Sequence, residues 1–583
     1  MPLTGRLVIR PAMRALAEVL PDFAQLGRRN RRLARLEQAL ESAASYGAWR
    51  EAAMSYDKEA GLEEWKFTDA SPFYDFKLIQ RRLAQILGAR EGGYQRRLMF
   101  ILQEGLHGNL GNISNPMLYR FTRFGTKRLI EHYLDEVCEA LDWLCDDESG
   151  EITLAEKIEF FEATSQTFGQ SSLMLSGGAA LGIYHMGVVK SLWENGLLPH
   201  VISGSSAGSI VAAMLGTHSD EELREVMAHR ESLVGLIKWN SPPRTHLFDV
   251  EHFNVKLKER IGEMSFQEAF RHSGRAINIT VSAYDPLDEG RLLNYRTSPN
   301  VVINSAVRAS CAAPFLLPPV ELLGKTINGE IIPYLKNRKF LDGSIGDDLP
   351  IRRLTRLYGV NHSIVSLVNP LVLPFASRSA HQGNDVSSMT RQYATRLFKE
   401  TTNFSMQLVQ KGIPFDNVNF AIDKLRSVLI QDYRGDITLV PPRSPAHVFK
   451  LFSDQSHAEE TEFVAIGARI TWPYLEMIKN TTAVSRTFRA CLDRLHARAQ
   501  NAPRARGRKG FLHGVIHERL QEMGMRDLRL HLRRSPRPAG QGHRAGHALG
   551  RRSRGFRVPG LRHQQVRFRP AAGVRRAPGT RDA

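Results

Sequence analysis

The chain has 583 residues, of which 42% are hydrophobic and 24% are charged. This composition is ordinary for a globular protein and excludes the fibrous and disulfide-rich classes. The formal net charge of +19 is concentrated at one end, because residues 501–583 contain 20 Arg and one Lys against four acidic residues. The rest of the chain is nearly neutral, so the charge gives no reason to expect a nucleic-acid partner for it.

Residues 1–168 are predicted to form an all-helical N-terminal domain. Apolar residues recur at helical spacing in residues 33–44, 79–87 and 130–141. The first 36 residues carry eight Arg against two acidic residues. We interpret them as a basic helical entry, with a mitochondrial transit peptide as the alternative.

Residues 169–370 are predicted to form an α/β domain. Two β-prone runs, residues 172–175 and 201–202, are each followed by a glycine-containing turn and a helical stretch. Strands at 277–284 and 363–368 and a helix at 301–312 continue the alternation. Such alternation predicts a mainly parallel sheet between helical layers.

The second turn reads Gly204-Ser205-Ser206-Ala207-Gly208. The spacing Gly-x-Ser-x-Gly is typical of a nucleophile elbow, in which a serine projects from a sharp turn between a strand and a helix. Glycine at positions 204 and 208 removes side chains that would collide with the neighbouring strand and helix. Glycine and serine are common, so the interpretation depends on the setting of the pentad between a strand and a helix.

The first turn is a glycine loop, Gly177-Gly178-Ala179-Ala180-Leu181-Gly182. A dinucleotide fingerprint would require glycine at position 179, and a Walker loop would require Lys directly after Gly182. Two interpretations remain. The loop either serves packing alone, or it brings backbone amides close to an oxyanion, because Gly177 and Gly178 carry no side chain.

Asp342 is the candidate base for Ser206. It ends a β-prone run before Gly343, where catalytic side chains of α/β proteins gather, although an Asp-Gly pair is also a common turn. An ordinary carboxylate has a pKa of about 3.9 and is a weak base, so we expect it to lie against Ser206 in a partly dehydrated site. The later histidines belong to no motif, and for His185 we expect a packing or hydrogen-bonding role.

The glycine loop, the GSSAG pentad, the later Asp-Gly and the intervening ASCAAP of residues 309–314 together resemble a patatin-like phospholipase domain. The resemblance covers about residues 170–370 and implies a three-layer α/β/α fold with a Ser–Asp dyad and no catalytic histidine. It assigns Ser206 as nucleophile and Asp342 as its partner. The oxyanion hole and the supporting turn positions that it implies are Gly177, Gly178 and Ala179, and Gly182, Gly204, Gly208 and Gly343.

The chain departs from this family at two loop positions. Ala179 replaces the third glycine, and Leu181 stands where the family has Arg or Lys. The missing cation favours neutral glycerides over lipids with anionic head groups. Residues 65–66, 71–75 and 104–113 also resemble the N-terminal region of a patatin subgroup that includes storage triacylglycerol lipases.

The resemblance implies a serine hydrolase of lipid esters, a triacylglycerol lipase or a phospholipase A, that forms an acyl-enzyme and needs no cofactor or metal. The alternatives are a transacylase or lysophospholipid acyltransferase that uses the same site, and a non-catalytic lipid-binding protein. No apolar run of about 20 residues occurs, so we expect a cytoplasmic protein bound peripherally to a membrane or lipid droplet. Residues 314–319 (PFLLPP) either dock on lipid or form a buried loop.

Residues 371–500 are predicted to form a helical extension, and residues 501–583 a disordered tail. The tail is an Arg-rich arm for RNA or anionic lipid, a solvated tail without function, or a stretch read out of frame. The four cysteines lack metal-site spacing and are expected to be free thiols.

Overall fold

The structure is a computed structural model. It describes residues 29–228, 235–236, 238, 249–285, 288–314, 316–370, 372–373, 431, 433–442 and 456–501. The chain divides into two compact units, residues 1–502 and 503–583, and every described residue belongs to the first. The expected tail beyond residue 501 and residues 374–430 of the expected helical extension lie outside the described residues.

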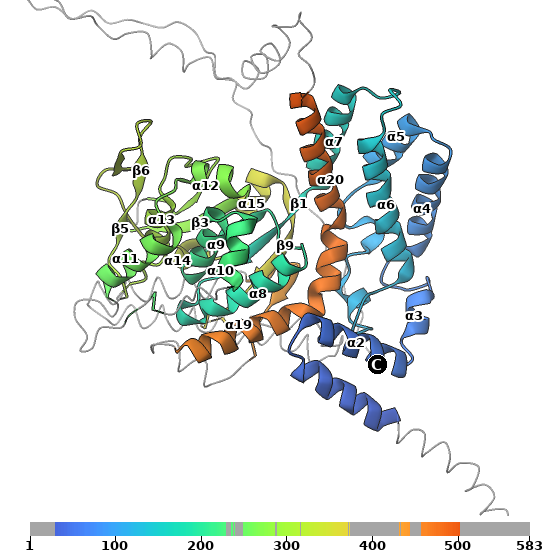
Figure 1. Cartoon of the computed structure of the whole chain (residues 1–583), viewed down its shortest axis with the longest axis horizontal. Coiled ribbons are helices and arrows are strands. Elements are labelled where there is room, and N and C mark those ends of the chain that lie inside the picture. The colour runs from blue at the N-terminus through green and yellow to red at the C-terminus, as the bar shows by residue number, and fades with distance from the viewer. Residues whose placement is uncertain are drawn as a thin grey trace, which may run out of the picture. The chain divides into compact units, whose positions relative to one another are not determined.

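The N-terminal region is helical, as predicted (Figure 1). A helix over residues 29–42 comes first. It is followed by α2 (Tyr46–Glu59), α3 (Glu63–Phe67), α4 (Phe76–Glu91), α5 (Gln95–Gly105), the 3₁₀ turns η1 (Leu110–Asn112) and η2 (Pro116–Tyr119), α6 (Arg128–Asp146) and α7 (Leu154–Phe168). The predicted apolar faces of α4 and α6 meet in one core, which contains Ile79, Leu83, Ile86, Ile130, Leu134, Val137 and Leu141.

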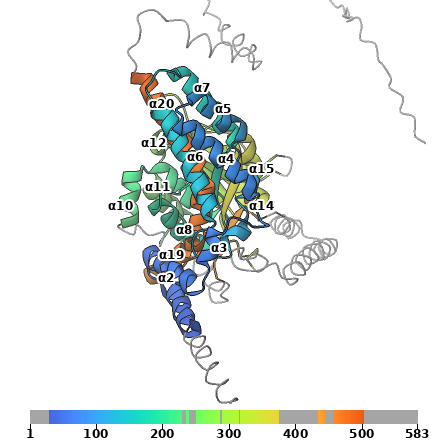
Figure 2. The same cartoon turned by 90° about the vertical axis from the view of Figure 1, so that its right-hand side faces the viewer.

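Residues 457–501 of the C-terminal extension are also helical, whereas residues 437–439 of the extension form a strand of the central sheet, which the helical prediction did not include. The helical part consists of α19 (His457–Thr471), the turn η5 (Trp472–Tyr474) and α20 (Leu475–Asn501). The first turn of α20 packs in the core of the α/β domain through Leu475 and Ile478, whereas Phe488 and Leu495 pack in the core of the N-terminal helices. One helix therefore joins two hydrophobic cores, as the side view in Figure 2 helps to follow.

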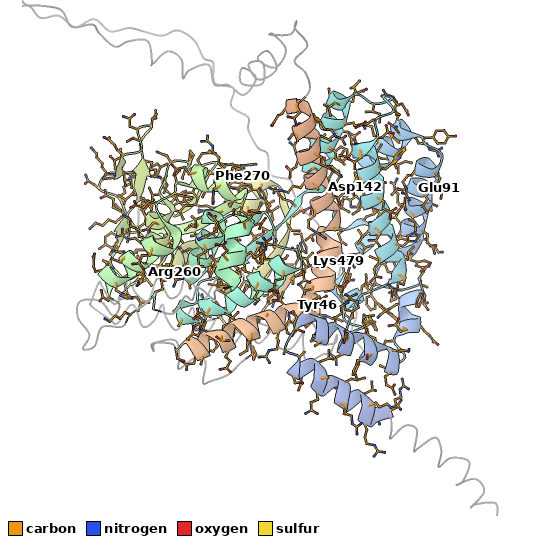
Figure 3. All side chains as sticks on the ribbon, viewed as in Figure 1. Tyr46, Glu91, Asp142, Arg260, Phe270 and Lys479 are labelled. Carbon is orange, nitrogen blue, oxygen red and sulfur yellow. The ribbon has the colours of Figure 1, made fainter. Side chains whose placement is uncertain are left out.

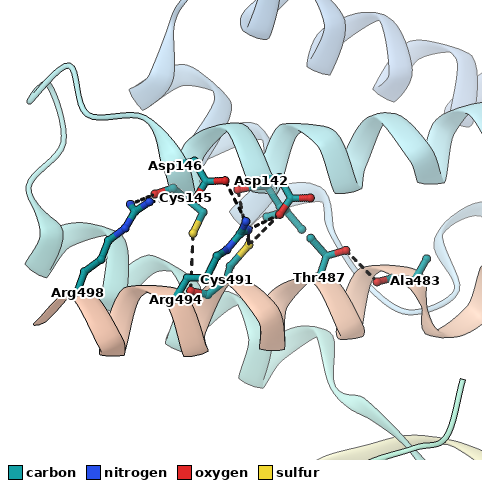
Figure 4. Close-up of polar contacts among 9 residues, drawn as sticks. Asp142, Cys145, Asp146, Ala483, Thr487, Cys491, Arg494 and Arg498 are labelled. Atoms are coloured by element: carbon teal, nitrogen blue, oxygen red, sulfur yellow. Dashed lines mark hydrogen bonds and ion pairs between the residues drawn. The ribbon is translucent and has the colours of Figure 1, made fainter. Parts of the chain in front are cut away.

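Polar contacts hold α20 against α6 (Figure 4). Arg494 of α20 donates to Asp142 and, at 2.9 Å, to Asp146 Oδ2. Asp142 lies where α6 meets α20 in Figure 3. The thiols of Cys145 and Cys491 are buried between the two helices and are free.

The central sheet has the strand order β10-β9-β1-β2-β3-β8-β5, and β4 also pairs with β3. The first five strands in this order are mutually parallel, and β4, β8 and β5 pair antiparallel. The predicted mainly parallel sheet is confirmed. The strands are β1 (Gln170–Leu175), β2 (Val201–Gly204), β3 (Ala276–Ala283), β4 (Arg291–Asn294), β5 (Val320–Glu321), β8 (Lys339–Asp342), β9 (Val360–Ser366) and β10 (Ile437–Leu439).

Both faces of this sheet are covered. Successive residues of a strand point to opposite faces, so neighbouring residues of a doubly covered strand enter different cores. Leu173 of β1 enters one core, and its neighbour Met174 enters another. The three-layer α/β/α prediction is therefore confirmed. The helices of the domain are α8 (Ile183–Glu194), α9 (Ala207–Thr217), α10 (Asp220–Ala228), α11 (Val250–Ile261), α12 (Phe266–Ser273), α13 (Ile303–Ser310), α14 (Gly343–Asp347) and α15 (Ile351–Tyr358).

Candidate active site

Ser206 occupies the turn between β2 and α9. Its backbone has φ 49° and ψ −122°, a conformation that residues other than glycine rarely adopt. The turn can be this sharp because a Cβ on Gly204 would lie 2.3 Å from the Gly208 carbonyl oxygen, and a Cβ on Gly208 would lie 2.2 Å from the Leu175 carbonyl oxygen. Any larger residue at either position would push the strand and the helix apart.

Asp342 ends β8 and is buried, with 3% of its surface exposed. Its main-chain N–H donates to the Ala312 carbonyl oxygen at 3.1 Å. Its Oδ1 accepts hydrogen bonds from Ser344 N at 2.9 Å and from Ser344 Oγ at 2.7 Å. The Ser206 side chain lies beside the same carboxyl group and acts to lower its pKa. The structure thus brings together the two residues that the sequence singled out from positions far apart in the chain.

The environment of Asp342 changes its basicity. Burial raises the pKa of its carboxyl group to about 6, and the Ser206 side chain and the hydrogen bonds from Ser344 oppose that rise. A base works best when its pKa lies near the operating pH, so this carboxylate is a stronger proton acceptor than an exposed aspartate.

The glycine loop approaches Ser206 closely. A Cβ on Gly177 would lie 3.2 Å from Ser206 Cβ, and a Cβ on Gly182 would lie 2.5 Å from Ala207 Cβ. The Gly177 amide, however, donates to Asp348 Oδ1 at 2.7 Å. It is therefore occupied, which differs from the expectation that it faces a reacting oxygen. Within the described residues, the Gly178 and Ala179 amides have no acceptor.

The chain matches the family described as patatin-like phospholipase over residues 173–355, and a domain of unknown function, DUF3336, over residues 26–166. Triacylglycerol lipase ptl3 of Schizosaccharomyces pombe is 32% identical to 79% of this chain, and the match covers 98% of that relative. This chain belongs to the patatin-like phospholipase family.

Two further members of the family extend beyond the matched region. Triacylglycerol lipase SDP1L of Arabidopsis thaliana is 33% identical over 78% of this chain and 58% of its own length. Triacylglycerol lipase 4 of Saccharomyces cerevisiae is 34% identical over 76% of this chain and 51% of its own length. The chain therefore spans little more than half of the length of these two relatives.

Asp348, a second buried carboxyl group beside the glycine loop, was not predicted from the sequence. Besides Gly177 N, it accepts a hydrogen bond from Asn369 Nδ2 on Oδ2 at 3.3 Å. Burial raises the pKa of Asp348 to about 7, which the bonds from Gly177 and Asn369 oppose and the nearby Asp342 carboxyl reinforces. The available signal was an acidic pair, Asp347-Asp348, a few residues after Asp342.

Ser310 was also missed. Its Oγ accepts the main-chain N–H of Ser206 at 2.9 Å, which holds the elbow from the end of α13. Its only signal was its place in the ASCAAP segment, to which the resemblance gave no role for an individual residue.

His185 has the hydrogen-bonding role expected of it. Its Nε2 lies 2.9 Å from the Ser176 carbonyl oxygen, and its Nδ1 lies 2.7 Å from Ser366 Oγ. A carbonyl oxygen only accepts, so Nε2 carries the hydrogen and Nδ1 accepts from Ser366. Burial lowers the pKa of His185 to about 4, and the ring is neutral. No described histidine is hydrogen-bonded to Ser206 or Asp342.

Proposed function

We propose that this chain is a serine acyl-ester hydrolase of lipids that works through a Ser206–Asp342 dyad. The single observation that carries the proposal is that the Ser206 side chain lies beside the buried carboxyl group of Asp342, whose pKa is raised to about 6. A serine hydroxyl needs a base in contact with it to become a nucleophile. The family membership and the lipase names of the relatives support the same chemistry.

In the acylation step, Asp342 takes the Ser206 hydroxyl proton while Oγ forms a bond to the ester carbonyl carbon. The carbonyl oxygen becomes a tetrahedral oxyanion, for which the Gly178 and Ala179 amides are the donors that we propose. The positive end of α9, which begins directly after Ser206, favours the same negative charge. The bond to the leaving alcohol then breaks, and Asp342 returns the proton to the alkoxide.

In the deacylation step, water attacks the acyl group on Ser206 Oγ. Asp342 accepts a proton from the water and then protonates Oγ as the fatty acid leaves. The cycle restores both residues and consumes one water for each ester bond, so it requires no cofactor.

The lining of the glycine loop supports a neutral glyceride as the preferred substrate. Leu181 stands at the position where the family has a cation, and it is buried with Val368 and Phe463 in an apolar cluster. This position therefore offers no charge to an anionic head group. The three relatives named above are triacylglycerol lipases, which agrees with this choice.

The proposal is tested by incubating the purified chain with a trioleoylglycerol emulsion and with dioleoylphosphatidylcholine vesicles. We expect oleate release from the emulsion to exceed release from the vesicles, and both Ser206→Ala and Asp342→Asn to abolish it. A fluorophosphonate probe should label the wild-type chain and not Ser206→Ala. Transfer of labelled oleate to an added lysolipid in place of its release would instead identify a transacylase.

A further inference from the structure

Three isoleucines are exposed together on a β-hairpin that has no part in the proposed chemistry. The hairpin consists of β6 (Leu323–Lys325) and β7 (Ile331–Pro333), which pair antiparallel. Ile327 at its tip is fully exposed, and Ile331 and Ile332 are 39% and 47% exposed. Figure 1 shows β6 projecting beyond β5 and α13. Exposed apolar clusters of this kind mark interaction sites.

The turn of the hairpin does not require an isoleucine. Thr326 N donates to the Glu330 carbonyl oxygen at 2.9 Å, and Gly329 N donates to the Thr326 carbonyl oxygen at 3.0 Å. Gly329 supplies the positive φ of 85°. Turn corners favour Asn, Asp, Ser, Pro and Gly, each for a backbone reason, whereas a β-branched residue such as Ile327 offers no such advantage. The isoleucine at the tip therefore calls for a role outside the fold of the hairpin.

Apolar side chains project from both faces and from the end of the hairpin, and the turn between them also exposes Asn328 and Glu330. Ile331 and Ile332 are consecutive strand residues, so their side chains point to opposite faces of the hairpin. Ile327 adds an apolar side chain at the end. A protein partner that docks on one face would leave the isoleucine of the other face in water, whereas an apolar liquid phase would surround all three.

Strand addition by a peptide or a second copy of the chain does not fit this hairpin. The outer edge of β6 already pairs with residues 300–302, because Val302 N donates to Leu323 O at 2.9 Å and Lys325 N donates to Asn300 O at 2.8 Å. The strand β7 includes Pro333, which has no N–H to offer. Both edges are thus poor templates for another strand.

The base of the hairpin is basic. The base carries four cations, Lys325, Lys336, Arg338 and Lys339, whereas the acid Glu330 lies in the turn at the tip. Lys336 and Lys339 are exposed, whereas Lys325 and Arg338 pair with Glu268 and Asp288. An apolar tip above a basic base matches the order of layers at a phospholipid surface, where acyl chains lie beneath phosphate groups.

The hairpin is anchored close to the nucleophile. Its base is bonded to Val302, the residue before α13, and Ser310 at the end of α13 accepts the Ser206 amide hydrogen at 2.9 Å. A helix of this length spans about 12 Å. We propose that the β6–β7 hairpin inserts Ile327, Ile331 and Ile332 into the acyl-chain layer of a phospholipid-covered lipid surface. This inference rests on the proposed function and adds how Ser206 comes within reach of an ester at that surface.

The predicted docking alternative at residues 314–319 is not supported by the burial of that segment. Leu317 is buried in the core of the α/β domain, and the other described residues of the segment are half-buried. Phe315 lies outside the described residues. The exposed apolar cluster begins only eight residues after the end of this segment, at Ile327.

The test compares the full chain with the variant Ile327→Asn, Ile331→Thr, Ile332→Thr, whose replacements suit a turn and a strand. Each protein is floated with a trioleoylglycerol emulsion coated with phosphatidylcholine and phosphatidylserine. We expect the partition of the variant to fall at least about tenfold. The control Phe100→Ser removes a single aromatic on α5 that is 64% exposed, and it should float like the wild type.

Hydrolysis of p-nitrophenyl butyrate, a dissolved ester, reports the active site separately and should be equal in all three proteins. If the triple variant floats like the wild type, the docking inference is overturned. Loss of a dimer in light scattering of the variant would overturn it as well, in favour of self-association. If the wild type floats but hydrolyses neither ester, the proposed function fails while the docking inference stands.

Discussion

The Gly177 amide donates its hydrogen to the buried carboxyl group of Asp348, with 2.7 Å between Gly177 N and Asp348 Oδ1. The main-chain N–H of Asp348 donates in turn to Gln431 Oε1 at 2.8 Å. The glycine loop is therefore tied to the segment that follows Asp342. Because each peptide unit is planar, the bond to Asp348 fixes the peptide plane between Ser176 and Gly177, from which the rest of the loop continues.

Replacing Asp348 with alanine should lower both stability and turnover. The Gly177 N–H would be buried without an acceptor, at a cost of about 1–3 kcal/mol. The matched variant Asp348→Asn keeps a carbonyl oxygen for this N–H, so we expect it to retain more of both properties. Thermal unfolding and the kcat and KM for a dissolved ester measure the effects. We expect a lower kcat with little change in KM, and an unchanged kcat in Asp348→Ala would contradict the positioning role.

The activity should fall as the pH falls below about 6. Burial raises the pKa of Asp342 to that value, and only the ionised form can accept the Ser206 proton. The pH dependence of kcat/KM for a dissolved ester measures this acidic limb. Asp348 has a pKa raised to about 7 and interacts with Asp342, so Asp348→Asn is the control. If the acidic limb disappears in Asp348→Asn, the group that titrates is Asp348 and not Asp342.

Asp342→Asn should be inactive and yet no less stable at alkaline pH. The folded-state pKa of about 6 lies above the ordinary value, so the folded state binds this proton more tightly than the unfolded state does. The contribution of Asp342 to stability is therefore fully present below a pH of about 3.9 and is lost as the pH rises through about 6. Thermal unfolding of both proteins is measured at acidic and alkaline pH. We expect the unfolding temperature of Asp342→Asn to rise relative to that of the wild type as the pH rises.

Ala179→Gly should stabilise the protein. Ala179 has a φ of 47°, in the left-handed region, where an alanine costs roughly 1–2 kcal/mol relative to its preferred conformations. Part of the gain is offset by the greater freedom of glycine in the unfolded chain. The neighbouring variant Ala180→Gly is the control. Ala180 has no positive φ, so the same change at this position should destabilise the protein. Equal shifts in the unfolding temperatures of both variants would contradict the strain at Ala179.

The elbow could be predicted because its five residues are contiguous and each constraint on them is local. Asp342 could be predicted because it ends a strand and the resemblance marked it. The bond between Gly177 and Asp348 could not, because it joins residues 171 positions apart and either acid of the pair 347–348 could equally have faced water. Burial was equally open from the sequence at residues 314–319, where the structure agrees with the buried-loop alternative, and at the isoleucines of the hairpin, which are exposed.

His185→Ala should reduce stability and leave the chemistry intact. The imidazole bridges the ends of β1 and β9 through Ser176 and Ser366, and its removal leaves the Ser176 carbonyl oxygen buried without this donor. We expect a lower unfolding temperature and a kcat within the same order of magnitude as the wild type. A folded His185→Ala protein as inactive as Ser206→Ala would require a histidine in the mechanism and contradict the Ser206–Asp342 dyad.

Gly187→Ala should separate two helices that touch through their backbones. A Cβ at Gly187 of α8 would lie 2.0 Å from the Val464 carbonyl oxygen of α19, and no rotation of a side chain can relieve that contact. We expect the free energy of unfolding to fall by about 1–3 kcal/mol or more. The control is Gly88→Ala on α4, where a Cβ meets nothing within 4 Å and the change should stabilise the helix. Because α8 directly follows the glycine loop, a shift of this helix should also move the Gly178 and Ala179 amides. We therefore expect the kcat for a dissolved ester to fall in Gly187→Ala and to stay constant in Gly88→Ala.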